Sequence, residues 1–292
     1  MFAVIGLAVV CGSVLLGYTM HGGKVAALMQ FSEFIIIGGA ATGSVLAANS
    51  PAIVIRTIKG VLSLLKGNPY TKACHMELLQ MLYDIFMLAR REGLVALDEH
   101  AERPSESKLF ANCPFFFNHH HALSFMADTL KVLVSGGVAT HDLSDMMDID
   151  LETSHEEALK PSAVLAKVAD AMPGFGIVAA VLGVVITMSA IGGPPEQVGE
   201  KVAAALVGTF IGVLMCYGVF GPVAMALEGQ AKAEEKYMAC IKCALLSFAR
   251  GDPPLTAVEF ARRNIEPIVR PSFSEMEQTV KTAGRAPVAQ AA

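Results

Sequence analysis

Charged residues are scarce in this sequence. Asp, Glu, Lys and Arg make up 17% of its 292 residues, and tryptophan is absent, whereas soluble domains carry roughly 25% charged residues. The net charge of −5 comes without the basic stripe that is typical of nucleic-acid binding. The six cysteines suggest no disulfide framework, and Cys240 with Cys243 forms a lone CxxC, which is a weak metal signal. We therefore expect a membrane protein that binds neither nucleic acid nor metal.

Two long runs without any charged residue dominate the second half of the chain. Residues 171–195 read AMPGFGIVAAVLGVVITMSAIGGPP, residues 202–227 read VAAALVGTFIGVLMCYGVFGPVAMAL, and only EQVGEK lies between them. Each run exceeds the ~20 apolar residues that cross a bilayer, so we predict a transmembrane hairpin. Pro173 and Pro222 lie within the runs, and each is expected to bend its helix. Proline is also commoner in membrane helices generally, so the residue type alone assigns no role.

Two further apolar runs lie near the start, at residues 2–20 and 34–50. The second contains the pair Gly39 and Gly43, whose GxxxG spacing permits close helix packing. We predict four membrane spans in an all-α fold, because no alternating strand pattern is present. The expected parts are spans one and two (1–50), a large cytoplasmic helical loop (51–169), spans three and four (170–227), and a cytoplasmic C-terminal helix with a tail (228–292).

The cytoplasmic loop has the periodicity of amphipathic helices. Apolar residues at spacings of three and four recur between residues 75 and 100 and form a stripe of five, namely Leu78, Leu82, Ile85, Phe86 and Ala89. A further helix is expected from near residue 117, interrupted at Gly136 and Gly137. A short helix is expected over residues 255–264, and the tail from Lys281 is small and polar enough to be disordered.

Lysine and arginine predict the orientation in the membrane. Residues 51–169 hold eleven of the 22 and residues 228–292 hold nine, whereas the two short loops contain only Lys24 and Lys201. The positive-inside rule places the side rich in these residues in the cytoplasm. We therefore predict a multi-pass protein of the bacterial inner membrane with both termini in the cytoplasm.

The predicted spans lack a titratable group at mid-depth. Asp170 lies at the cytoplasmic entrance of span three, and Glu33 and Glu228 are expected at the membrane interfaces. Proton relays use Asp, Glu or His within the membrane, so a proton-moving function requires a carboxylate from another chain. Thr209 lies inside Gly208-x-x-x-Gly212. Its hydroxyl is expected either to face a partner or pore, or to donate a hydrogen bond to the carbonyl four residues earlier in its own helix.

The triple His119-His120-His121 suggests a metal site, but adjacent side chains diverge on a helix, so exposed polar residues are the favoured interpretation. No Gly-rich phosphate loop, nucleophile elbow or zinc signature is present. An enzyme is not expected.

Several strings along the chain resemble the MotA family of flagellar motor stator subunits, part of the MotA/TolQ/ExbB proton channel family. They are PGFGIVAA from Pro173, GTFxG from Gly208, YGxxxP ending at Pro222, YTKA from Tyr70, AxxxGxxxL around Arg90, PSES, AVEF from Ala257, and RPSF from Arg270. The similarity covers essentially the full chain with spacings kept. It implies a ring of five such chains around two copies of MotB, a single-span protein that supplies the membrane carboxylate.

The resemblance also implies roles for individual residues. The family's two functional prolines map onto Pro173 and Pro222. Its charges that contact the rotor protein FliG map onto Arg90 and Asp98, and another acidic position maps onto Asp150. The family more usually has Glu where Asp98 stands, so this side chain has a reach shorter by one methylene.

The coupling ion is predicted from Ala180 and Thr209. Sodium-driven relatives share the threonine at 209 but have a second threonine at the position of Ala180, so one oxygen ligand for Na⁺ is missing here. Proton coupling, with no cofactor, is therefore expected. The alternatives are a sodium-driven stator subunit, an ExbB- or TolQ-type energiser, which resembles a three-span chain without this loop and the RPSF end, and a stand-alone channel, which would need its own membrane charge.

Overall fold

The computed structural model describes residues 2–189 and 191–283, and all regular secondary structure within these ranges is helical. The predicted all-α fold is confirmed. The chain forms two compact units. We call residues 1–67 with 158–230 the apolar unit, and residues 68–157 with 231–292 the polar unit. Two long helices have residues in both units. The division into units therefore does not test where the membrane spans begin and end, and those boundaries stay a prediction.

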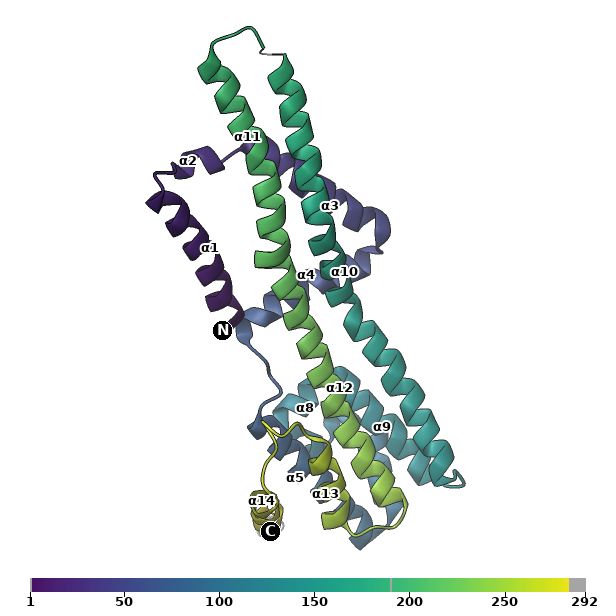
Figure 1. The fold of residues 1–292 in the computed structure, drawn as a ribbon. Helices are drawn as coiled ribbons and strands as arrows, with labels where there is room; N and C mark the ends of the chain where they lie inside the picture. Colours follow the sequence, from purple (N-terminus) through teal and green to yellow (C-terminus); the bar gives the residue numbers. More distant parts are fainter. Residues whose placement is uncertain (1, 190, 284–292) are drawn as a thin grey trace. The chain divides into compact units, whose positions relative to one another are not determined.

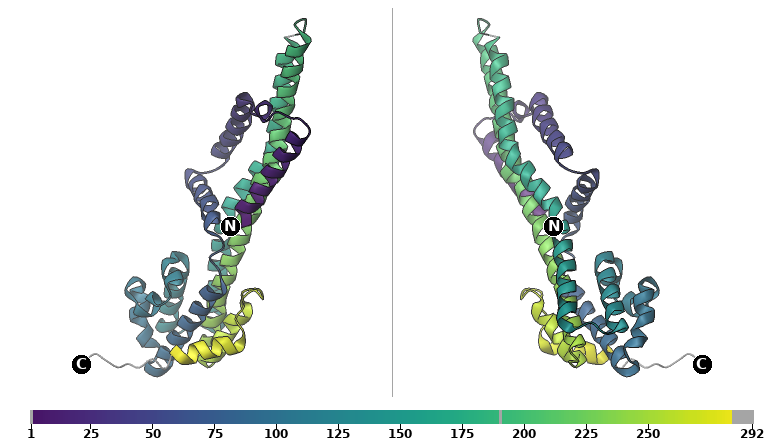
Figure 2. Two further views of the ribbon diagram at one scale, coloured as in Figure 1. Left: turned by 90° about the vertical axis from the view of Figure 1, so that its left-hand side faces the viewer. Right: turned by 90° about the vertical axis from the view of Figure 1, so that its right-hand side faces the viewer.

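The apolar unit contains the helices that begin the chain and those that form the predicted hairpin. In chain order they are α1 (Phe2–Met20), α2 (Val25–Leu28), α3 (Phe31–Ala48), α4 (Pro51–Ser63), the 3₁₀ turn η1 (Leu64–Lys66), the later part of α10 (Thr140–Met188), α11 (Pro195–Leu214), the π-helix η4 (Met215–Phe220) and the start of α12 (Gly221–Ala249). In this unit α10 and α11 lie side by side, as all three views show (Figures 1 and 2).

Three helical stretches of the described chain are long and apolar enough to cross a membrane: Val25–Ala48, Thr140–Met188 and Pro195–Ala249. The predicted first span corresponds to α1, whose stretch Val4–Met20 is a shorter apolar helix. Many large apolar side chains of these helices are exposed, among them Ile35, Leu46 and Val185. The apolar unit is therefore that of a membrane protein, because soluble proteins rarely expose contiguous apolar surface of this extent.

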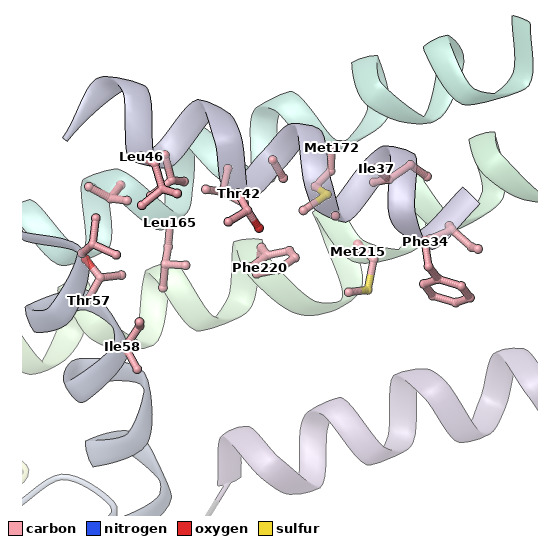
Figure 3. A pocket seen from close by; sticks show the side chains of 17 residues that line it. Phe34, Ile37, Thr42, Leu46, Thr57, Ile58, Leu165, Met172, Met215 and Phe220 are labelled. Carbon is pink, nitrogen blue, oxygen red and sulfur yellow. The ribbon is translucent and has the colours of Figure 1, made fainter. Parts of the chain in front are cut away.

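An apolar pocket of about 350 Å³ lies within this unit between α3, α4, α10 and the α11–η4 segment (Figure 3). Phe34, Met172 and Phe220 contribute to its lining. Thr42 and Thr57 bring hydroxyl groups to it, and the Thr57 hydroxyl donates to the carbonyl of Ile53 at 2.9 Å. This lining suits hydrocarbon rather than a polar substrate.

The polar unit is built from shorter helices. They are α5 (Lys72–Glu92), η2 (Leu94–Leu97), α6 (Asp98–Glu102), η3 (Pro104–Glu106), α7 (Lys108–Ala111), α8 (Pro114–Asn118), α9 (His120–Ser135), the first part of α10, the later part of α12, α13 (Pro254–Asn264) and α14 (Phe273–Ala283). The interruption predicted at Gly136 and Gly137 is confirmed, because both glycines have positive φ, 69° and 81°, between α9 and α10.

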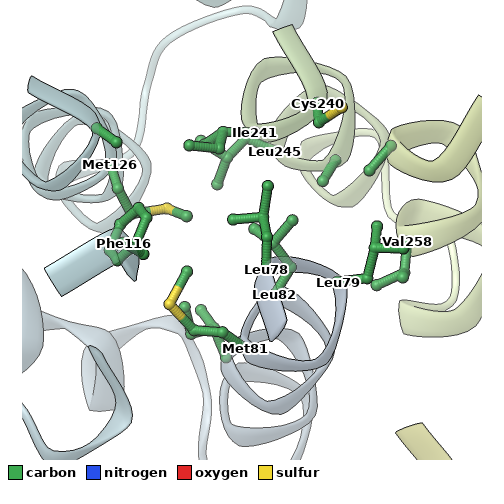
Figure 4. Packing of buried hydrophobic residues seen from close by; sticks show 14 of the residues in the cluster. Leu78, Leu79, Met81, Leu82, Phe116, Met126, Cys240, Ile241, Leu245 and Val258 are labelled. Carbon is green, nitrogen blue, oxygen red and sulfur yellow. The ribbon is translucent and has the colours of Figure 1, made fainter. Parts of the chain in front are cut away.

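The core of the polar unit forms around α5. The predicted stripe of five apolar residues on this helix is buried, with exposures between 0 and 6%. It packs against residues of α8, α9, α12 and α13, including Phe116, Met126, Ile241 and Val258 (Figure 4). Cys240 of the CxxC pair is fully buried in this cluster, and burial raises the pKa of its thiol. A thiol in this state is a poor nucleophile and metal ligand, so Cys240 acts as a core side chain.

Two of the strings that carry the family resemblance have a structural explanation. In YTKA, the Thr71 hydroxyl accepts a hydrogen bond from the Cys74 amide and caps α5, and Lys72 pairs with Glu275 at 2.8 Å. In RPSF, the Arg270 guanidinium donates to the carbonyls of Ile265 and Arg263 at 2.8 and 2.9 Å. These contacts hold the chain that follows α13 in place.

The predicted helix over 255–264 is found as α13, which begins one residue earlier. The prediction that the chain is disordered from Lys281 is wrong at its start, since α14 extends through Ala283. This helix begins with a capping box, in which the Ser272 amide donates to Glu275 at 2.7 Å and the Glu275 amide donates to the Ser272 hydroxyl at 3.2 Å. The remainder of the predicted tail, 284–292, lies outside the described residues.

Candidate functional site

Helices α10 and α11 approach each other at their backbones. We call Gly176 and Gly183 of α10, with Gly208 and Gly212 of α11, the glycine seam. A Cβ added to Gly176 would lie 2.8 Å from the carbonyl oxygen of Gly208, and one added to Gly212 would lie 2.6 Å from that of Met172. Because the obstructing atoms are backbone, no rotamer change relieves the clash. Positions 176 and 212 therefore require glycine, and small residues of this kind allow close contact between membrane helices.

The structure brings Ala180 and Thr209 together at this seam. A Cβ on Gly208 would lie 3.4 Å from the Ala180 nitrogen, and a Cβ on Gly176 would lie 3.3 Å from the Thr209 Cα. Within the described residues the Thr209 hydroxyl donates no hydrogen bond, whereas the Thr187 hydroxyl donates to the Gly183 carbonyl at 2.8 Å. This difference favours the first interpretation of Thr209, that of a hydroxyl free to face a partner or pore.

The two predicted functional prolines occupy different backbone settings. Pro173 lies inside α10, directly after Met172, whose carbonyl abuts Gly212 in the seam. Pro222 lies in the first turn of α12, immediately after the six-residue π-helix η4. A proline ring crowds the carbonyl four residues earlier, which for Pro222 is that of Gly218. The π-helix η4 includes Gly218, and π turns inside α-helices are often found at functional sites.

Glu33, expected from the sequence at a membrane interface, is buried against α11 in the structure. It is in the first turn of α3 and is 4% exposed. Its Oε2 atom would lie 2.5 Å from a Cβ on Gly208, so the carboxylate occupies the space that this glycine leaves open. The same oxygen is buried without a hydrogen-bond partner among the described residues. The hydrophobic periodicity and the composition of the sequence could not predict this burial, because it depends on the contact of α3 with α11.

The three predicted rotor-contacting residues are exposed on the polar unit. Arg90 lies in the last turn of α5, and Asp98 begins α6 after the turn at Gly93, whose φ is +88°. Neither side chain forms an ion pair within the described ranges, which leaves both charges available. Asp150, on α10, differs, since its Oδ1 atom accepts from the Ser154 hydroxyl at 3.3 Å and lies 3.9 Å from His121 Nε2.

The interpretation of His119, His120 and His121 as exposed polar residues is wrong for two of the three. Only His120 is exposed. His119 Nε2 lies 3.3 Å from Glu234 Oε1 and 3.1 Å from the Tyr70 hydroxyl, and His121 Nδ1 lies 3.9 Å from the same carboxylate oxygen. The charge partner comes from α12, more than a hundred residues away, which the local pattern could not show. No metal-ligating group of three is found among the described residues.

This histidine cluster predicts a pH-dependent stability. The pKa of His121 is raised by Glu234, against the opposing effect of burial and with help from Asp150. Burial would raise the pKa of Glu234, but His119 and His121 outweigh it and lower that pKa to about 2. The contribution of protonated His121 to stability is complete below the ordinary histidine pKa of about 6.5, and it is lost as pH rises through the raised pKa. The Glu234 contribution is complete above the ordinary value of about 4.5 and is lost as pH falls toward 2.

We therefore expect Glu234→Gln to destabilise the polar unit most between about pH 4.5 and 6.5, by about 1–3 kcal/mol. The difference from wild type is expected to shrink toward pH 8 or above, where His121 is neutral in both proteins. Denaturant unfolding of the full chain in detergent across this range measures it. Glu152→Gln is the control, because Glu152 is exposed on the same unit and has no ion pair among the described residues. A destabilisation that is the same at every pH would contradict the assignment.

Comparison with known proteins agrees with this architecture. The profile of the Motility protein A N-terminal family matches residues 4–93, and that of the MotA/TolQ/ExbB proton channel family matches residues 118–239. Motility protein A of Salmonella typhimurium is 38% identical over 281 residues, which cover 96% of this chain and 95% of that protein. Motility protein A of Escherichia coli is 39% identical over the same shares. The chain belongs to the Motility protein A family.

The MotA fold is also found in solved structures. The structure of C. jejuni MotAB matches with a TM-score of 0.74 at 19% identity, over 91% of this chain and 95% of that one. Membership in the family confirms the predicted flagellar stator subunit, a component of motility that is not an enzyme. It also decides against the energiser alternative, because the match to Motility protein A extends over nearly the whole chain.

Proposed function

We propose that this chain forms, with MotB, the ion-conducting stator unit that couples proton flow across the inner membrane to torque on FliG. The observation that carries the proposal is the full-length similarity to Motility protein A, at 38–39% identity. The glycine seam supports it, because it places Ala180, Thr209 and the Met172–Pro173 backbone on one helix contact. The solved relative is a MotAB complex, which supports MotB as the partner.

In this proposal four spans cross the membrane, with α1 as the first and both termini in the cytoplasm. At ~1.5 Å per residue, the 19 residues of α1 reach about 28 Å, close to the ~30 Å of hydrocarbon. The distribution of lysine and arginine supports the orientation, since 20 of 22 lie in residues 51–169 and 228–292. Five copies surround two MotB spans, and the exposed apolar faces of the unit contact lipid and neighbouring copies.

The proton enters from the periplasm between spans three and four and reaches the MotB carboxylate near Thr209. Neutralising that buried charge changes how it packs against the Pro173 and Pro222 regions, and the ring steps around the central dimer. Ala180 contributes no oxygen at the seam, which favours a proton over Na⁺ as the coupling ion. One proton crossing 100 mV delivers ~2.3 kcal/mol, so torque requires many such steps.

Complementation tests this function. Cells that lack their own stator genes are given this chain, MotB, or both, and swimming is expected only with both. The speed is expected to follow the proton gradient and to be independent of external sodium. Affinity purification through MotB, followed by mass measurement of the complex, counts the copies. Swimming that follows sodium would overturn the ion assignment, and swimming with this chain alone would overturn the requirement for MotB.

The exposed charges of the polar unit predict a rotor contact. Arg90→Glu is expected to reduce swimming speed several-fold, because rotor pairing across an interface depends on charge complementarity. A compensating acid-to-base change on FliG is expected to restore part of that speed. The control is Arg103→Glu, since the Arg103 side chain is 69% exposed and lies near Glu106 of its own unit. The absence of rescue by any reversed rotor charge would contradict the pairing.

A further inference from the structure

Glu33 is the one acid of α3, and its Oε2 atom is buried beside Gly208 of α11. A Cβ on Gly208 would lie 2.5 Å from Glu33 Oε2, 3.1 Å from the Ala179 Cβ and 3.4 Å from the Ala180 nitrogen. All these residues belong to the apolar unit. Nothing in the described part of this unit forms an ion pair or hydrogen bond with Oε2. Glu33 therefore holds one carboxyl oxygen buried without a partner.

An ionised carboxylate in such a place is costly. Burying an unpaired charge is unfavourable, and acids within the membrane region mark ion pathways or proton relays. A proton removes that cost, whereas the N-terminal turn of α3 favours the ionised form. Because these two effects oppose each other, both the protonated and the ionised form of Glu33 are accessible, as a reversible proton site requires.

The position of Glu33 relates it to the proposed ion path. It contacts Gly208, which immediately precedes Thr209, and it lies beside Ala180. A cavity of about 680 Å³ lies between α1, α2 and α11, and its lining includes Gln30, the residue before α3, and Val207, the residue before Gly208, together with Glu200 and Lys201. Its polar groups suit water. In the proposed topology this is the periplasmic side, so a proton could reach Glu33 from outside.

We propose that Glu33 is a proton-binding site of this chain that takes up the proton on the periplasmic side and passes it on toward the MotB carboxylate. The proton leaves water, binds a carboxylate oxygen of Glu33 and is released to the next acceptor, so charge and protons balance. The inference rests on the proposed function and deepens it. It supplements the expectation that MotB alone supplies the titrating group.

Infrared difference spectroscopy tests the site independently of motility. The complete complex with MotB, in lipid nanodiscs, is compared between about pH 5 and about pH 8, a range in which perturbed carboxyl groups titrate. A protonated-carboxyl band is expected in wild type and in Glu196→Gln, whose side chain is exposed on α11. The part of the band that Glu33 contributes is expected to be lost from Glu33→Gln, while the part from the MotB carboxylate remains. A band of unchanged intensity in Glu33→Gln would overturn the inference.

Swimming speed tests the path. Glu33→Gln is expected to reduce speed at least about two-fold at external pH 8 and less at pH 6, because a collecting acid matters most when protons are scarce. Glu33→Asp, which keeps the acid, is expected to restore part of the speed, and Glu196→Gln to swim as wild type. Wild-type speed of Glu33→Gln at every pH, or failure of Glu33→Asp to exceed it, would overturn the inference.

Measuring assembly with MotB distinguishes a variant that does not assemble from a failure of the Glu33 site or of the proposed function. Co-purification of each variant with MotB is measured first, and Glu33→Asp provides the test if Glu33→Gln does not assemble. Normal swimming of Glu33→Gln leaves the stator function standing and removes only the Glu33 site. If the wild-type chain with MotB supports no proton-driven swimming, the proposed function itself fails, whatever the behaviour of Glu33.

Discussion

Replacement of Gly176 by alanine is expected to abolish most swimming and to destabilise the chain in detergent. The added Cβ would lie 2.8 Å from the carbonyl oxygen of Gly208 and 3.2 Å from the Cα of Gly212, so the two helices must separate. Overpacking of this kind typically costs about 1–3 kcal/mol. Alanine is a better helix former than glycine by about 1 kcal/mol, so a net loss of stability can be attributed to the contact.

The matched control for this substitution is Gly199→Ala. Gly199 lies in α11, the helix that Gly176 of α10 contacts, but a Cβ there would meet nothing within 4 Å. We expect this variant to swim normally and to be as stable as wild type or slightly more so. Thermal unfolding in detergent and swimming in complemented cells measure both effects. If the two alanine variants behave alike, the close packing of α10 against α11 is not what the function needs.

Much of the fold could be predicted because it depends on local patterns. The stripe on α5 has a period that only one buried helical face explains, and all five of its residues are buried. The uncharged runs likewise predicted the α10–α11 hairpin. Close packing was predicted at Gly39 and Gly43, where a Cβ would meet nothing within 4 Å among the described residues, whereas the close contact lies at Gly208 and Gly212. The sequence did not indicate that Gly176 lies opposite Gly208 and Gly212, or Gly183 opposite Ala205, because the register between two helices depends on contacts between them.

The candidate site could be predicted only where it rests on residue type. Proline at 173 and 222 and the missing oxygen at Ala180 are visible in the sequence. The burial of Glu33 and the pairing of His119 and His121 with Glu234 are not, because each depends on a residue far along the chain. Single charged residues near the ends of apolar runs therefore need the tertiary structure before they can be interpreted.

Replacement of Pro173 by alanine is expected to abolish torque while flagella still assemble and the chain still binds MotB. Proline has no N–H, so the carbonyl of Ala169, four residues earlier, lacks its usual helical donor, and alanine would supply one. Helix formation at this position would become more favourable by up to about 3 kcal/mol. The variant is thus expected to be at least as stable as wild type. Loss of swimming would then reflect a stiffened α10 beside the Met172–Gly212 contact rather than unfolding.

The same helix provides the control, because Pro161 also lies inside α10. Pro161→Ala makes the same chemical change twelve residues earlier, outside the uncharged run and away from the glycine seam. We expect it to retain swimming, whereas Pro173→Ala is expected to stop it at equal expression and equal MotB binding. Swimming and rotation of tethered cells measure torque, and thermal unfolding in detergent measures stability. Normal torque in Pro173→Ala, or equal loss in both variants, would show that the position of this proline beside the seam does not matter.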